Sequence, residues 1–366
     1  MTNYAPIPFF AYNRPFHTER TLTALSKCIG AEESELFIYI DAPKKAEDID
    51  NVNCVKNICY SKQWCYKVHI IENSENKWPL TLIDAVKTLC DDYERVIVLE
   101  DDILVSPYFL NYMNKALEKY KNTDKVMEIS GLCYPIKIKS NEKGNIEAFF
   151  TEQTMTWGWG TWKRAWRFFE SDINKLLPMF SDKEMRSKLE LGGVNNTYKM
   201  LLDVKENKYP GWDVRWHASK IIHGGLTLVP TQPFVCNIGF DGSGQHCGVS
   251  ANYFFKLRQK EVALFPDKID VNQTYQKALC KFLYKENQIR YKYFRNVIKK
   301  ILPKIFTKFI KIINRKIIML SVFYILKMKI KMKRFIKDIT PPILLWVIKH
   351  LTIKNNRMVF GGYENW

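Results

Sequence analysis

Three consecutive carboxylates, Glu100, Asp101 and Asp102, follow a short apolar run at 96–99 that has the composition of a buried strand. Adjacent carboxylates repel one another, so three of them at a strand end are best tolerated when a cation joins them. Hard divalent cations such as Mg²⁺ and Mn²⁺ take oxygen ligands and commonly bind through one or two carboxylates together with substrate phosphates. The triplet therefore predicts a divalent-cation site, with a solvated acidic turn as the alternative.

The triplet belongs to an N-terminal region in which strand-like and helical patterns alternate. Short apolar runs rich in Ile, Val, Phe and Tyr predict the strands, and polar or periodic stretches predict the helices. This order predicts an α/β domain with a Rossmann-like, mostly parallel sheet and flanking helices. We expect strands at 7–12, 36–40, 68–71 and 96–99, and helices at 19–27, 80–89 and 108–120.

Three of the four predicted strands end in polar or charged residues. Arg14 comes shortly after the first strand, Asp41 directly after the second, and the acidic triplet after the fourth. In a sheet of this kind, ligands bind at the carboxyl ends of the strands. We therefore expect Arg14, Asp41 and the triplet to line one site.

The triplet and its strand resemble the metal-binding motif of GT-A glycosyltransferases, in particular the family of the N-acetylglucosaminyltransferase that initiates complex N-glycans and its bacterial relatives in polysaccharide synthesis. The resemblance implies a GT-A fold in which Asp102 contacts Mn²⁺ or Mg²⁺. It implies that Glu100 and Asp101 position the ribose and the metal-bound water. It also implies that Arg14 and Asp41, which match by position, contact a uridine nucleotide.

Residues 155–166 resemble the acceptor-side segment of the same family, which bears glycine and tryptophan. Indole rings offer flat faces and N–H donors that suit a sugar. We therefore assign Trp157 and Trp159 to acceptor binding, with core packing as the alternative. Trp162 and Trp166 stand four residues apart, which is helical spacing, and we expect both in the core.

The segment 211–216 resembles the Trp-Asp segment of that family. The resemblance implies that Asp213 is the catalytic base, which deprotonates the acceptor hydroxyl in a single inverting displacement. One carboxylate suffices for such a step when a metal neutralises the departing diphosphate. The alternative is that Asp213 forms a salt bridge with Arg215 or caps a helix.

The glycine-rich segment 236–247 resembles the closing segment of the bacterial relatives. Its glycines would let the backbone wrap a diphosphate, with Ser243 and the amides as donors. We assign His246 to the metal or to a phosphate, with an incidental loop histidine as the alternative. The remaining histidines show no ligand spacing and are assigned no role: His17, His69, His217, His223 and His350.

The formal charge of +18 over 366 residues is concentrated at the C-terminal end. Within 297–310, pairs of apolar residues recur four apart with lysines between them, which predicts a basic amphipathic helix. Such helices lie on anionic membranes. Nucleic acid is not expected as a partner, because contacts to phosphates alone need no apolar face. A dimerisation or docking tail is the alternative.

These features divide the chain into a GT-A domain at 1–276, a basic membrane-associating tail at 277–356, and the start of a truncated or following module at 357–366. Nine scattered cysteines without a C-x-x-C motif favour a reducing compartment. The sequence has no recognisable signal peptide, and its apolar stretches are shorter than the roughly 20 residues that span a bilayer. We expect a peripheral protein on the cytoplasmic face of a bacterial cell membrane.

The sequence as a whole predicts a metal-dependent, inverting hexosyl- or N-acetylhexosaminyltransferase. Its donor would be a nucleotide-sugar, expected to be a UDP-sugar, and its acceptor a glycan or lipid-linked oligosaccharide in surface polysaccharide synthesis. A non-catalytic sugar-binding or membrane-scaffold protein with a decayed site is one alternative, because the family's ribose-contacting histidine has no counterpart near 78–82. A sugar nucleotidyltransferase is another, although the residues after the first predicted strand lack the glycine-rich loop expected there. P-loop, dinucleotide-binding, nucleophile-elbow and H-E-x-x-H motifs are absent from the sequence.

Overall fold

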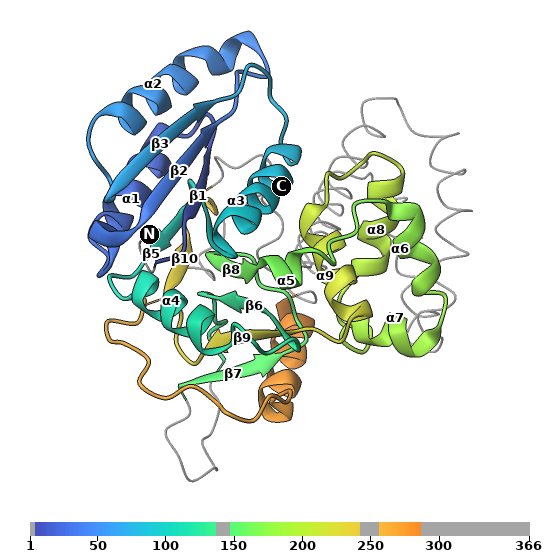
Figure 1. The fold of residues 1–366 in the computed structure, drawn as a ribbon. Helices are drawn as coiled ribbons and strands as arrows, with labels where there is room; N and C mark the ends of the chain where they lie inside the picture. Colours follow the sequence, from blue (N-terminus) through green and yellow to red (C-terminus); the bar gives the residue numbers. More distant parts are fainter. Residues whose placement is uncertain (1–3, 137–146, 242–255, 287–366) are drawn as a thin grey trace, which may run out of the picture. The chain divides into compact units, whose positions relative to one another are not determined.

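The structure, a computed structural model, describes residues 4–136, 147–241 and 256–286 (Figure 1). Two of the predicted site residues, Ser243 and His246, lie outside the described residues. So does the predicted membrane-associating tail from residue 287 onward, together with the predicted start of a further module.

The first half of the sheet contains the four predicted strands in parallel. These are β1 (Ile7–Ala11), β2 (Glu35–Ile40), β3 (Lys67–Glu72) and β4 (Arg95–Glu100), and they lie in the order β3-β2-β1-β4. The apolar runs predicted these strands to within two residues. β1 is buried along its whole length, and β4 along all but its first residue, as expected for central parallel strands.

Three helices of this half were predicted, and a fourth was not. α1 (Pro15–Leu25) begins four residues before its predicted start. Proline is well suited to the first turn of a helix because its missing N–H would have no partner there. α3 (Leu80–Tyr93) packs against β1 and β4, and α4 (Phe109–Lys119) lies close to its predicted place. α2 (Ile49–Tyr60), which packs against α1, is the additional helix.

The second half of the sheet mixes strand directions. It contains β6 (Val126–Ser130), β7 (Ala148–Thr151), β8 (Trp159–Trp162) and β9 (Leu226–Pro230), in the order β4-β8-β6-β9-β7. β8 runs antiparallel to both β4 and β6, and β7 runs antiparallel to β9. The other strands share one direction, so the prediction of a mostly parallel sheet is confirmed.

Gly160 makes the insertion of β8 beside β4 possible. A Cβ atom there would lie 2.8 Å from the carbonyl oxygen of Val96 and 3.0 Å from the methyl carbon of Met113 on α4. Only glycine fits between strand and helix at such distances. The sequence pattern did not reveal this close approach.

The remaining elements are two short strands and a group of helices. Directly after the acidic triplet comes a short strand, β5 (Ile103–Val105), which pairs antiparallel with β10 (Val235–Asn237). The sequence analysis did not predict a strand here; the helix expected at 108–120 follows β5 as α4. Five helices stand between β8 and β9, and the last four contact one another: α5 (Lys163–Trp166), α6 (Ile173–Met179), α7 (Lys183–Leu189), α8 (Thr197–Lys205) and α9 (Trp212–Ile222).

A buried aromatic cluster fixes α9 against the sheet. The ring of Trp159 on β8 stacks on that of Trp212 at 5.5 Å between centroids, and Trp216 lies 5.0 Å from Trp166. The indole N–H of Trp216 donates to Glu128 on β6 at 2.7 Å. Because α9 carries Asp213 in its first turn, this cluster sets the position of the predicted base.

Residues 273–286 are helical and run across the predicted boundary between 276 and 277. Tyr275 from this helix contacts Phe149 on β7, with ring centroids 4.0 Å apart, and Phe282 contacts Tyr134 at 5.2 Å. Within the ranges that the structure describes, every helix is too short or too polar to cross a membrane.

Trp216→Phe is expected to destabilise the fold by about 1–3 kcal/mol, because it leaves a buried carboxylate oxygen of Glu128 without its indole donor. The matched control is Trp159→Phe in the same cluster, since that indole N–H is buried and has no hydrogen-bond partner among the described residues. The measurement is urea unfolding of both variants and the parent. Equal destabilisation by the two substitutions would contradict the role given to the Trp216–Glu128 hydrogen bond.

Candidate active site

The acidic triplet lies buried at the carboxyl end of the central strand β4. Glu100 is the last residue of β4, and Asp101 and Asp102 form the turn into β5. All three residues are almost completely buried, with Asp102 at 0% exposure. The backbone N–H of Asp101 donates to the carbonyl of Phe10 on β1 at 3.0 Å, which ties the triplet to the neighbouring strand end. The alternative of a solvated acidic turn is therefore wrong.

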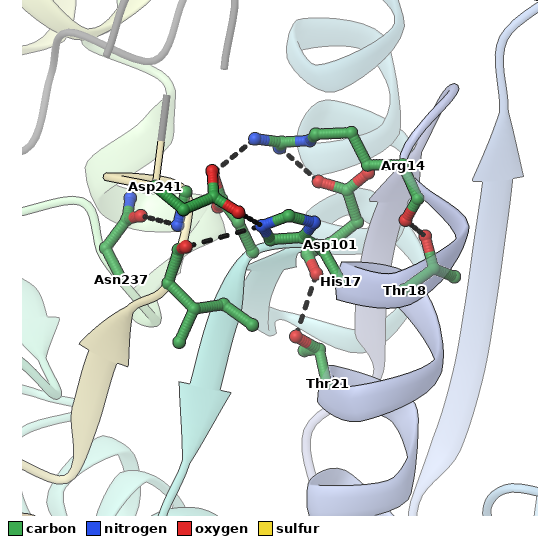
Figure 2. Close-up of polar contacts among 10 residues, drawn as sticks. Arg14, His17, Thr18, Thr21, Asp101, Asn237 and Asp241 are labelled. Carbon is green, nitrogen blue, oxygen red and sulfur yellow. Dashed lines mark hydrogen bonds and ion pairs between the residues drawn. The ribbon is translucent and has the colours of Figure 1, made fainter. Parts of the chain in front are cut away.

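Arg14 brings the end of β1 to the triplet. It stands at the N-terminus of α1, and its guanidinium donates to Oδ2 of Asp102 at 2.8 Å and to Oδ1 of Asp101. Figure 2 shows the guanidinium beside the Asp101 carboxylate. The structure thus brings Arg14 and the triplet together, as two of the three parts of the predicted site. Their contacts to a nucleotide stay a prediction.

Several carboxylate oxygens of the site are buried and have no hydrogen-bond partner within the described part of the chain. They are both oxygens of Glu100, Oδ1 of Asp102 and Oδ2 of Asp213. Burial raises the pKa of Glu100 well above its usual range, and the charges of Asp102 and Asp101 raise it further. Burial also raises the pKa of Asp101, although Arg14 acts in the opposite direction. Buried acceptors without partners are costly, so they mark a place where a donor or cation is missing.

Asp213 belongs to the same site from the other half of the sheet. It lies in the first turn of α9, and its Oδ1 accepts a hydrogen bond from the hydroxyl of Tyr209 at 2.9 Å. Burial raises the pKa of Asp213 to about 7, against the opposing effect of that hydrogen bond. The charge of Asp213 in turn raises the pKa of Glu100, which places the two carboxyl groups within electrostatic reach.

The salt bridge between Asp213 and Arg215 that the sequence left open is not formed. The guanidinium of Arg215 instead donates to the backbone carbonyls of Ser171 and Pro210, at 3.0 and 3.1 Å. Arg215 therefore acts on Asp213 only through its charge, which lowers the carboxyl pKa slightly. This leaves one oxygen of Asp213 held by Tyr209 and the other free to accept a proton.

A segment that follows β10 closes over Asp102. The backbone N–H of Ile238 donates to the carbonyl of Asp102 at 2.8 Å. A Cβ atom on Gly239 would lie 2.4 Å from Oδ2 of Asp102 and 3.0 Å from the guanidinium of Arg14. The N–H of Gly239 donates to the side chain of Asn237 at 2.7 Å. Gly239 therefore allows a close approach to Asp102 that the sequence analysis did not identify, and the later glycines of the segment lie outside the described residues.

His17 is a site residue that sequence analysis missed. It lies on α1, 5% exposed, with Nε2 3.3 Å from the carbonyl oxygen of Ile238 and 3.2 Å from Oδ2 of Asp241 (Figure 2). His17 was assigned no role because no metal-ligand spacing surrounds it. The available signal was its spacing of three residues from Arg14, which places both side chains on one side of a helix.

Asp41 lies at the end of β2 and is held by two neighbours. Its Oδ1 accepts hydrogen bonds from the side-chain amide of Asn73, at 2.7 Å, and from the hydroxyl of Thr81, at 3.3 Å. Asn73 follows β3 and Thr81 lies in α3, and the sequence analysis named neither. The backbone N–H of Asp41 donates to the carbonyl of Ala11 at the end of β1, so Asp41 lies at the expected edge of the sheet.

The two tryptophans assigned to acceptor binding are completely buried. Trp157 packs edge-on against Phe240, with ring centroids 5.7 Å apart, and Trp159 lies inside the aromatic cluster. Core packing, the alternative for both, describes their positions here, and an acceptor contact stays a prediction. Trp162 and Trp166 are buried as expected, but their helical spacing was wrong, since Trp162 ends β8 and Trp166 ends α5.

Whether the triplet can hold a metal ion depends on which of its oxygens Arg14 leaves without a partner. Among the described residues, no three His, Cys, Asp or Glu side chains are arranged to hold a metal ion, and Arg14 takes one oxygen each from Asp101 and Asp102. Oδ1 of Asp102 and both oxygens of Glu100 nevertheless remain without partners in that part of the chain. These hard acceptors fit a cation that binds through one or two carboxylates and completes its shell with substrate phosphates.

Comparisons with known proteins give limited information. No protein-family model and no curated protein matches the chain. Residues 1–349 of S. aureus TarS match with a TM-score of 0.35 and 11% identity, over 63% of this chain and 59% of that one. A further structure of S. aureus TarS matches with a TM-score of 0.32 and 10% identity, over 63% of this chain and 36% of that one. The chain thus covers less than two thirds of either TarS chain, and neither similarity assigns it a function.

Asp213 is expected to make stability fall as pH rises. Its pKa is about 7 when folded and about 3.8 when unfolded, so the folded state holds a proton that the unfolded state has released between these values. The free energy of unfolding should therefore fall by about 1.4 kcal/mol per pH unit in this window from this group alone. Asp213→Asn should remove that decrease.

The measurement is urea unfolding of the parent and Asp213→Asn at intervals between pH 5 and 8. Tyr209→Phe provides a second variant, because losing its hydrogen bond should shift the parent's midpoint to higher pH. A free-energy difference between parent and Asp213→Asn that is constant across this range would show that Asp213 does not titrate near 7.

Proposed function

We propose that the chain is a metal-dependent, inverting glycosyltransferase of the GT-A fold. Its donor is a nucleotide-sugar, a UDP-sugar by resemblance, and its acceptor is a hydroxyl of a glycan or lipid-linked oligosaccharide. One observation carries this proposal: buried carboxylates for a cation are paired with a guanidinium for phosphate, and a carboxyl group with a pKa near 7 acts electrostatically on one of them. In the sequence, Asp102 lies 88 residues after Arg14 and 111 residues before Asp213.

The donor side is formed by the ends of β1, β2 and β4. Asp41, held by Asn73 and Thr81, and Arg14 contact the nucleotide in this proposal. Asp102 holds the cation through its free Oδ1, with Glu100 beside it. The cation would supply positive charge against the negative charge that develops on the departing diphosphate.

Asp213 acts on the acceptor. Its free Oδ2 takes the proton of the acceptor hydroxyl while that oxygen bonds to the anomeric carbon. The bond from the anomeric carbon to the diphosphate breaks in the same step, and the diphosphate leaves with the electron pair. One displacement inverts the anomeric carbon, so a single base suffices. A base with a pKa near the working pH is efficient, because it is partly deprotonated yet still basic.

Asp102→Asn is expected to reduce Mn²⁺-dependent transfer or donor hydrolysis by at least about 100-fold, because the amide lacks the charge that holds the cation. The assay measures release of UDP from a panel of UDP-sugars with the full chain, with and without Mn²⁺. The matched control is Asp84→Asn, an exposed carboxylate on α3, which should behave as the parent. Undiminished Mn²⁺-dependent release by Asp102→Asn would remove Asp102 from the proposed metal site.

Membrane association through the basic tail is part of the proposal and rests on the sequence alone. Replacing five lysines by glutamine should weaken binding to anionic vesicles at least about 100-fold, since each basic residue near the surface contributes about 1 kcal/mol. The measurement is cosedimentation with phosphatidylglycerol vesicles, with phosphatidylcholine vesicles as the control. Unchanged cosedimentation would contradict the role of these lysines: Lys299, Lys300, Lys304, Lys308 and Lys311.

A further inference from the structure

Arg14 occupies the carboxylates that the proposed cation needs. One guanidinium nitrogen donates to Asp102 and another to Asp101, so a single side chain bridges two separate carboxylates. No other lysine or arginine that the structure describes forms an ion pair with the triplet. The side chain of Arg14 is 17% exposed, so it lies at the rim of the site and not beneath it.

The charge of Arg14 does not balance the site. Three buried carboxyl groups, from Glu100, Asp101 and Asp102, lie close to this one guanidinium, and a fourth, from Asp213, interacts with Glu100. Four of their oxygens have no hydrogen-bond partner in the described ranges. The site can therefore accept more positive charge. The guanidinium of Arg14, however, already binds Asp102, the residue proposed to hold the metal.

A divalent cation on Oδ1 of Asp102 would lie only a few ångströms from the guanidinium on Oδ2, because both oxygens belong to one carboxylate. Two cations at that separation repel each other strongly where water is excluded. The backbone at Gly239 lies so close to this ion pair that an added Cβ atom would meet both the Asp102 carboxylate and the guanidinium. Metal alone should therefore bind poorly while Arg14 remains on the triplet.

A diphosphate removes this conflict. Guanidinium groups bind phosphate oxygens with the same forked geometry that they use for carboxylates. A phosphate at the rim gives Arg14 a new anionic partner, and it adds negative charge and oxygen ligands for the cation. Diphosphate binding thus draws Arg14 away from Asp102, as the cation requires, and cation binding to Asp102 frees Arg14 for the diphosphate.

We infer that Arg14 couples the two ligands of the site: it neutralises Asp101 and Asp102 in the free protein and moves onto the diphosphate when the cation binds Asp102. This inference rests on the proposed function and assigns Arg14 a second role within it. Coupling of this kind is reciprocal, so the cation must strengthen diphosphate binding by the same factor. Arg14 is thus a counter-ion in one state and a phosphate ligand in the other.

The test measures Mn²⁺ binding by the electron paramagnetic resonance signal of free Mn²⁺, with the full chain, with and without UDP. A protein-free titration corrects for Mn²⁺ bound by UDP itself. For the parent we expect weak binding of Mn²⁺ alone and at least 10-fold tighter binding with UDP. Arg14→Gln should bind Mn²⁺ alone at least threefold more tightly than the parent, and UDP should tighten its Mn²⁺ binding by a clearly smaller factor than in the parent, since only the direct phosphate ligands remain.

Two further variants make this result specific. Arg20→Gln, an exposed residue two turns along α1, is the matched control and should reproduce the parent. Arg14→Lys keeps the charge but cannot bridge two carboxylates with a fork, so it should retain weak binding of Mn²⁺ alone with reduced coupling to UDP. If Arg14→Gln fails to fold, as judged by circular dichroism, Arg14→Lys carries the test by its coupling alone.

The outcomes separate the inference from the function on which it rests. If Arg14→Gln binds Mn²⁺ alone as weakly as the parent, or keeps the parent's response to UDP, the coupling role of Arg14 is wrong and the metal site stands. If Arg14→Lys retains the parent's full coupling, the coupling role of Arg14 is likewise wrong. If neither the parent nor any variant binds Mn²⁺ with or without UDP, the proposed metal-dependent function is itself contradicted.

Discussion

The burial of the acidic triplet beside a single guanidinium, with the buried carboxyl group of Asp213 acting on Glu100, is the constraint on which this site depends. Charged groups are expensive to remove from water unless they are paired, and here the described residues provide only Arg14 for the triplet. The raised pKa values of Glu100, Asp101 and Asp213 express that cost. Such buried carboxyl groups are typical of functional sites, where a bound ligand supplies the missing positive charge and hydrogen-bond donors. This is why residues with shifted pKa values cluster at such sites.

The fold brings these groups together from positions that are far apart in the sequence. The parallel half of the sheet delivers Arg14 and the triplet to one edge, because parallel strands end on the same side. The antiparallel strand β8 then joins this half to the second one and carries Trp159 into the aromatic cluster. That cluster fixes α9 and so the position of Asp213. The β5–β10 pair brings Gly239 over Asp102.

The sequence predicted the parallel half well, since apolar strands and polar strand ends are local patterns. It selected the triplet and Arg14 as candidate site residues for the same reason, whereas Asp213 was selected through the resemblance of its segment to a known family. It missed His17, Asn73, Thr81 and Gly239, whose importance arises from neighbours distant in the chain. The close approach of Gly239 to Asp102 depends on the pairing of β5 with β10, which no local pattern specifies. The sequence also could not decide between acceptor binding and core packing for Trp157 and Trp159, because an indole ring suits both a sugar and a core.

The most direct test of the central claim is thermal unfolding of the full chain with a panel of nucleotide-sugars, with and without Mn²⁺. A ligand at 100 times its dissociation constant adds about 2.7 kcal/mol of stability, which such an experiment detects readily. We predict that a UDP-sugar together with Mn²⁺ raises the unfolding temperature and that neither ligand alone does so to the same extent. No shift with any nucleotide-sugar, with or without Mn²⁺, would contradict the assignment of this site to glycosyl transfer.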